Sequence, residues 1–120
     1  MTYYFDIAPL AKPRMVRSDR YRKRPVVERY WAYKDGLKLL ANLQQFELPD
    51  SFSVRFFIPM PKSWSKKKKV EWEGKPHQQR PDLDNLLKAL LDCLCDEDSH
   101  IYEIRASKWW ATEGRIVITT

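Results

Sequence analysis

The sequence predicts a single α+β domain with a mixed β-sheet and two packed helices. Several short stretches alternate apolar and polar residues, as strands do, and two longer stretches carry apolar residues at helical spacing. The chain has 120 residues, which suits one domain spanning residues 1–120. In chain order the predicted elements are a strand at 3–7, a helix at 26–45, a strand at 52–60, a helix at 84–95, and strands at 101–109 and 115–119. This order is that of an α+β domain.

The first two elements are a short strand and a helix that packs on the sheet. Tyr3, Phe5 and Ile7 lie at alternate positions, and Pro9 stops this strand because proline has no N–H to donate to a neighbouring strand. From 26 to 45 the apolar residues recur every three or four positions, which places them on one side of a helix.

The clearest strand is at 52–60, where apolar residues occupy every second position. Pro59 and Pro61 end it. The strand at 101–109 is followed by a turn at 111–114, and the last strand returns beside it.

The helix at 84–95 gives the strongest periodic signal. Its leucines form one apolar stripe at positions 83, 86, 87, 90, 91 and 94. At 100° per residue, Asp84 and Lys88 point to one flank of the stripe, and Asn85 and Asp92 are expected on roughly the opposite side. Asp82 stands at the N-cap position.

The acidic residues around this helix admit two interpretations. In the ordinary one, Asp82 and Asp84 stabilise the positive end of the helix dipole and Asp84 pairs with Lys88. Asp96, Glu97 and Asp98 fit that interpretation badly, because they follow the negative end of the dipole and repel one another. Such a group needs a cation, and a set of carboxylate oxygens suits Mg²⁺ or Mn²⁺ rather than zinc.

The charge balance favours a polyanionic partner. Lys and Arg number 22 against 16 Asp and Glu, giving a formal charge of +6. Two basic segments are candidates for contacting DNA phosphates, although either could instead be a solvated loop. The candidate DNA-binding residues are Arg14, Arg17, Arg20, Arg22, Lys23 and Arg24 in the first segment, and Lys66, Lys67, Lys68, Lys69 and Arg80 in the second. Trp64 and Trp72 bracket the four lysines and are predicted to be exposed for stacking.

The composition also predicts the cellular compartment of the protein. Cys93 and Cys95 are two apart on one helix and cannot form a local disulfide, so a reducing compartment is expected. No apolar run approaches the roughly 20 residues of a membrane span, and the first residues lack a signal-peptide pattern. A cytoplasmic protein without a membrane partner is predicted.

The pattern Asp82-x-Asp84-Asn85-x-x-Lys88, followed by an amphipathic helix and the acidic pair Glu97-Asp98 before a strand, resembles the RusA family of Holliday junction resolvases. The resemblance is close from residue 80 to 120. It implies a metal-dependent, homodimeric endodeoxyribonuclease that cuts four-way junctions in DNA recombination and repair. The catalytic residues that it implies are Asp82, Asp84, Asp98 and Lys88, and the metal ligands are Asp82, Asp84 and Asp98.

Several points stay open on the sequence alone. The family often has a longer loop before its second acidic pair, so Asp96 and Glu97 remain alternatives or additions to Asp98. A flap or other branched-DNA nuclease, or a non-catalytic basic DNA-binding module, are the alternative functions. A helix at 84–95 is about 17 Å long, which makes it difficult for Asp98 to return to Asp84 within one chain. A site shared between two antiparallel subunits is the hypothesis that follows.

Overall fold

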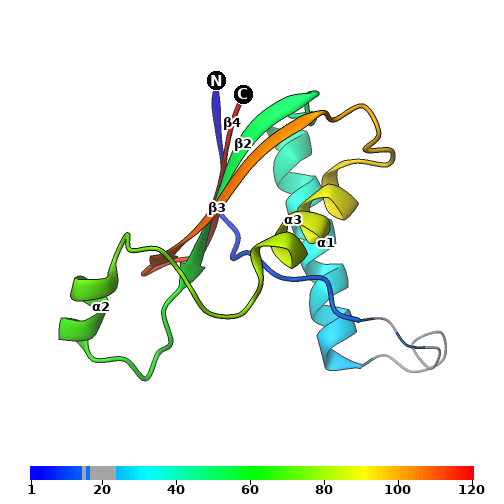
Figure 1. The fold of residues 1–120 in the computed structure, drawn as a ribbon. Helices are drawn as coiled ribbons and strands as arrows, with labels where there is room; N and C mark the ends of the chain where they lie inside the picture. The colour runs from blue at the N-terminus through cyan, green and yellow to red at the C-terminus, as the bar shows by residue number, and fades with distance from the viewer. Residues whose placement is uncertain (15, 17–23) are drawn as a thin grey trace.

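The computed structural model describes residues 1–14, 16 and 24–120, and it shows an α+β fold with a mixed four-stranded sheet and three helices (Figure 1). In chain order the elements are β1 (Thr2–Phe5), α1 (Pro25–Leu43), β2 (Ser51–Pro59), α2 (Lys66–Trp72), α3 (Leu83–Leu94), β3 (Glu103–Ala111) and β4 (Arg115–Thr119). The predicted α+β class with a mixed sheet is confirmed, as are six of these seven elements, and the predicted homodimer remains a prediction. The helix α2 was not predicted.

The sheet has the strand order β1-β4-β2-β3. Strands β2 and β3 pair in parallel, whereas β4 is antiparallel to both of its neighbours, β1 and β2. A parallel pair requires a long crossover between its strands, and this crossover contains α2 and α3. The segment that holds the candidate acids therefore links the two strands of the parallel pair.

One face of the sheet is covered by α1 and α3 (Figure 1). Along β2, Phe52, Val54, Phe56 and Ile58 are all less than a tenth exposed, because alternate side chains of a strand share one face. The apolar sides of the helices complete this core. No helix of the described residues covers the opposite face of the sheet, and Arg55 is exposed there.

Some element ends differ from the sequence prediction by a few residues. β1 ends at Phe5, the last residue that pairs with β4, so Ile7 lies beyond the strand. β3 starts at Glu103 and continues to Ala111, because β2 pairs with it in register as far as Pro59. The predicted turn is therefore shorter.

The segment around the four lysines is the main correction to the sequence prediction. Residues 66–72 form α2 rather than a polar loop. Ser65 caps this helix, because its hydroxyl oxygen accepts a hydrogen bond from the Lys68 N–H at 3.2 Å. Trp64 and Trp72 are only partly exposed and lie 6.2 Å apart between ring centroids. A short helix with a packed aromatic side thus replaces the expected exposed tryptophans.

Two smaller predictions were also tested. Cys93 and Cys95 are both free thiols, and burial raises the pKa of Cys93 to about 11. In the part of the chain that the structure describes, no helix is both long enough and apolar enough to cross a bilayer.

Candidate active site

Helix α3 presents one acid and one amine on its solvent side. Leu86 and Leu90 are fully buried in the core, and this orientation leaves the opposite flank free. The side chains of Asp84 and Lys88 are 71% and 70% exposed, and the Asp84 Oδ2 lies 3.9 Å from the Lys88 Nζ. The predicted shared flank of these two residues is confirmed.

Asp82 caps the start of α3 through its backbone. Its carbonyl oxygen accepts a hydrogen bond from the Leu86 N–H at 3.2 Å, while its side chain makes no capping bond. The side chain is exposed. The carboxylate oxygens of Asp82 and Asp84 are therefore turned to solvent at the positive end of the helix dipole.

The segment that leads to Asp82 is attached to the end of β3. Gly74 N–H donates to the Trp110 carbonyl and Trp110 N–H donates to the Lys75 carbonyl, both at 2.9 Å. His77 N–H donates to the carbonyl of Lys108 at 3.1 Å. These bonds run from α2 toward α3, so the basic helix and the two acids are held by the same strand.

His77 belongs to a small aromatic cluster under this segment. Its ring lies 4.2 Å from that of Trp110, whose ring is 4.8 Å from that of Trp64. His77 is only 3% exposed, and burial together with the nearby charge of Lys108 lowers its pKa. His77 therefore packs against Trp110 beneath this segment.

Asp98 lies beyond the C-terminal end of α3. A hollow of about 310 Å³ is lined by Lys12, Lys88, Leu91, Asp92, Cys95, Asp96 and Asp98. Within residues 1–14, 16 and 24–120, no three His, Cys, Asp or Glu residues are grouped closely enough to hold a metal ion. One chain therefore holds Asp82 and Asp84 at the start of the helix and Asp98 beyond its end.

Asp92 is a residue that sequence reasoning misplaced. Its Oδ2 accepts a hydrogen bond from the Tyr30 hydroxyl at 2.5 Å and lies 3.5 Å from the Lys34 Nζ, while its Oδ1 lies 3.5 Å from the Lys12 Nζ. The Tyr30 bond lowers the Asp92 pKa, and the two lysines add to that effect against the opposing effect of burial. The expectation that Asp92 faces away from Lys88 was wrong, because four residues correspond to about 40° on a helix.

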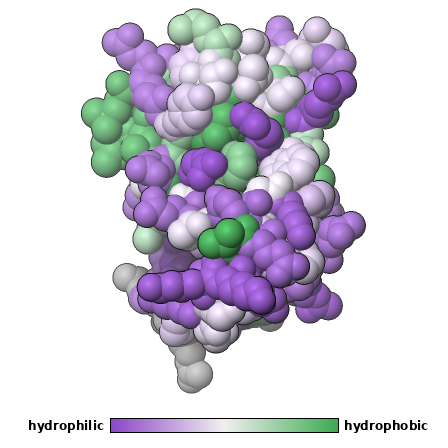
Figure 2. Space-filling view, turned by 90° about the vertical axis from the view of Figure 1, so that its left-hand side faces the viewer, coloured by the Kyte–Doolittle hydropathy of each residue, from purple (hydrophilic) through white to green (hydrophobic). Residues whose placement is uncertain are grey.

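The basic residues of the second segment lie on α2 and just before α3. On α2, Lys66 and Lys67 are exposed, and the Lys68 Nζ lies 4.1 Å from the centroid of the Trp64 ring. Arg80 is exposed just before α3. Hydrophilic side chains dominate the lower part of the molecule when it is viewed from the side of α2 (Figure 2).

The first basic segment is described only in part. The Arg24 guanidinium donates a hydrogen bond to the Arg14 carbonyl at 2.9 Å, so the two ends of this segment lie close together. Arg17, Arg20, Arg22 and Lys23 lie outside the described residues. Their role in DNA binding remains a prediction.

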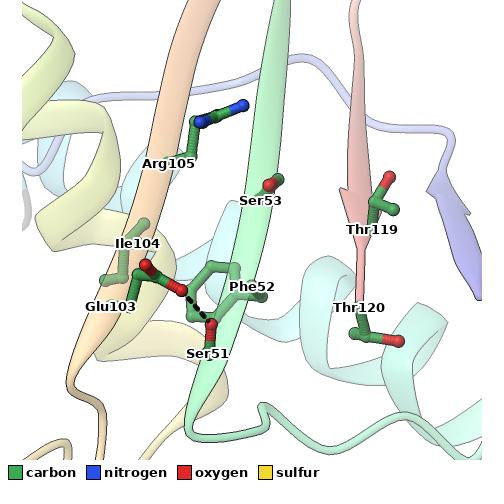
Figure 3. A pocket seen from close by; sticks show the side chains of 8 residues that line it. All are labelled: Ser51, Phe52, Ser53, Glu103, Ile104, Arg105, Thr119 and Thr120. Atoms are coloured by element: carbon green, nitrogen blue, oxygen red, sulfur yellow. Dashed lines mark hydrogen bonds between the residues drawn. The ribbon is translucent and has the colours of Figure 1, made fainter.

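The open face of the sheet carries a separate shallow hollow of about 520 Å³ (Figure 3). Ser53 lies on β2 between Arg105 of β3 and Thr119 of β4, and the Ser51 hydroxyl donates a hydrogen bond to Glu103 at 2.8 Å. These residues alternate with the buried ones along their strands, so the hollow lies on the face away from α3.

Comparisons with known proteins agree with this arrangement. The chain is 28% identical to the uncharacterized protein YqaN of Bacillus subtilis (strain 168) over 131 aligned positions, which cover 98% of this chain and 91% of YqaN. The family model described as endodeoxyribonuclease RusA matches residues 6–120. Since that match covers nearly the whole chain, the protein belongs to the RusA family of endodeoxyribonucleases, the Holliday junction resolvases.

Proposed function

We propose that this protein is a homodimeric endonuclease that uses Mg²⁺ or Mn²⁺ to resolve four-way DNA junctions in recombination and repair. The observation that carries the proposal is the pair of exposed carboxylates at the start of α3, Asp82 and Asp84, with Lys88 held 3.9 Å from Asp84. The basic helix α2 lies in the same crossover, directly before them.

The residues present fit a hard divalent cation. Asp82 and Asp84 offer only oxygen donors, and the N-cap leaves the carboxylate of Asp82 unused by the helix. Oxygen ligands are those that Mg²⁺ and Mn²⁺ prefer. A bound ion would supply an activated water and neutralise charge on the phosphate.

The protein's own groups supply the remaining functions. The Lys88 ammonium group, held near Asp84, is placed to stabilise negative charge that develops on the phosphate. Lys66 and Lys69 of α2, together with Arg80, bind the phosphate backbone and place the DNA strand over the two acids.

We further propose that each site takes Asp98 from the partner subunit. The 12 residues of α3 span about 17 Å, and within the described residues Asp98 is not grouped with Asp82 and Asp84 closely enough to hold a metal ion. If two such helices pack antiparallel across a twofold axis, the acids at the end of one lie near those at the start of the other. The resulting pair of sites suits symmetric cleavage of a junction.

Cleavage and binding of synthetic DNA test the proposal. The wild-type protein is expected to cut a four-way junction in Mg²⁺ in preference to a linear duplex or a flap. Asp82→Asn and Asp84→Asn should abolish cutting, while binding in EDTA stays equal or becomes stronger because negative charge near phosphates is removed. Asp35→Asn, at an exposed position of α1, is the matched control.

The controls also separate the alternatives. Preferential cutting of flaps would identify a flap nuclease, and binding without cutting by the wild-type protein would identify a binding module. Full activity of either α3 variant would refute the assignment of Asp82 and Asp84.

A further inference from the structure

Lys108 lies on the sheet face that the helices cover. It pairs with Phe56 across the parallel strands β2 and β3, and residues opposite one another in neighbouring strands point to the same face. Phe56 is fully buried, whereas Lys108 is partly exposed. A lysine at such a position needs a polar partner for its ammonium group.

The partners of that ammonium group are two backbone carbonyls that flank Arg80. Lys108 Nζ donates to the carbonyl oxygen of Pro81 at 2.7 Å and also to that of Gln79. An ammonium group has three donors and no acceptor, so two converging carbonyls suit it well. The bond to Pro81 ends at the residue immediately before Asp82.

These bonds continue the attachment of the crossover segment to β3. His77 N–H donates to the Lys108 carbonyl, so the backbone and the side chain of one residue both hold the segment. Beyond His77, the Lys108 ammonium extends that attachment as far as Pro81. The start of α3, and with it the direction of the Asp82 and Asp84 carboxylates, is thereby fixed relative to the sheet.

We propose that Lys108 is a positioning residue that orients Asp82 and Asp84 for metal binding without touching DNA. The inference rests on the proposed function of those two acids. Groups that orient metal ligands typically change metal affinity or activity by roughly 10- to 100-fold when they are removed. Loss of the Lys108 bonds should therefore raise the metal requirement and leave phosphate contacts unchanged.

Three variants test this role. Lys108→Met keeps the length of the side chain and removes every donor, while Lys108→Arg keeps a cation that can donate to two carbonyls. Arg55→Met removes one positive charge from the exposed, opposite face of the sheet and serves as the matched control. For each protein we would measure the Mg²⁺ concentration for half-maximal cutting, Mn²⁺ binding by calorimetry, thermal stability, and the salt dependence of junction binding in EDTA.

We expect Lys108→Met to need about 10-fold more Mg²⁺ and to bind Mn²⁺ about 10-fold more weakly. Lys108→Arg should recover most of that loss, and Arg55→Met should match the wild type. The slope of log K against log salt should be unchanged in Lys108→Met.

Two results would overturn the inference. A fall of about 0.9 in the salt slope with an unchanged metal requirement would make Lys108 a phosphate contact. Lower thermal stability with unchanged Mn²⁺ binding would make it a structural residue. If the wild-type protein cut no branched DNA, the proposed function would fail, and Mn²⁺ binding would still decide the role of Lys108.

Discussion

Neutralising the lysines of α2 should reduce the salt dependence of DNA binding by less than their number implies. Successive residues of a helix are 100° apart, so four consecutive lysines point in four directions and cannot all meet one strand. Lys66 and Lys69 are about 60° apart around the helix axis and line the same hollow with Val70, so they share one side. Lys68 points elsewhere, to the face of the Trp64 ring.

The expected magnitude follows from this geometry. Each phosphate contact with duplex DNA contributes roughly 0.9 to the slope of log K against log salt. The double variant Lys66→Gln/Lys69→Gln should therefore flatten the slope by about 1.8. Between 50 and 200 mM salt, the wild-type protein should lose about tenfold more affinity than this variant does.

Fluorescence anisotropy with a labelled four-way junction in EDTA measures this slope directly. Lys68→Gln is the internal control, and its slope of log K against log salt should equal that of the wild-type protein. The free energy of unfolding of this variant should be lower by about 0.5–1 kcal/mol, because the contact between Lys68 and the Trp64 ring is lost. A flattening of about 3.6 when all four lysines are neutralised would show that they act as an extended segment and would refute the helical reasoning. An unchanged slope in the double variant would exclude α2 from phosphate binding.

Three further predictions follow from other contacts. Mixing inactive Asp82→Asn and Asp98→Asn proteins under subunit exchange should restore nicking, because a mixed dimer rebuilds one shared site; heterodimers without activity would place each site within one chain. Tyr30→Phe should lower the free energy of unfolding by about 1–2 kcal/mol at pH 7, as measured by chemical denaturation, because it removes the hydrogen bond to the Asp92 carboxylate. The difference between the two proteins should vanish as pH falls through the lowered pKa of Asp92, since only the ionised carboxylate accepts this charge-assisted bond. Burial holds the folded-state pKa of His77 below its ordinary 6.5, so the unfolded chain takes up a proton first on acidification. The wild-type protein should therefore lose more stability than His77→Phe between pH 7.5 and 5.5, and equal losses would contradict the burial of that ring.

Local patterns in the sequence were sufficient for most of the secondary structure. The leucine stripe of α3 and the alternation along β2 depend on the fixed periods of helix and strand, so they can be recognised without knowledge of the tertiary contacts. The shared flank of Asp84 and Lys88 follows from the same period. The acids and the family resemblance pointed to a nuclease before the fold was known, and the family is confirmed over residues 6–120.

Long-range pairing had to come from the tertiary structure. The parallel pairing of β2 with β3 and the insertion of β4 between β1 and β2 join residues far apart in the chain, and no local period encodes such contacts. Helix α2 was missed because its lysine run has no apolar stripe; its Ser65 cap and its packing through Trp64 become evident only when the aromatic cluster forms. Lys108 shows the same limit most clearly. A lone lysine in a strand has no sequence signal, and its bond to Pro81 exists because the crossover segment folds back over β3, 27 residues away along the chain.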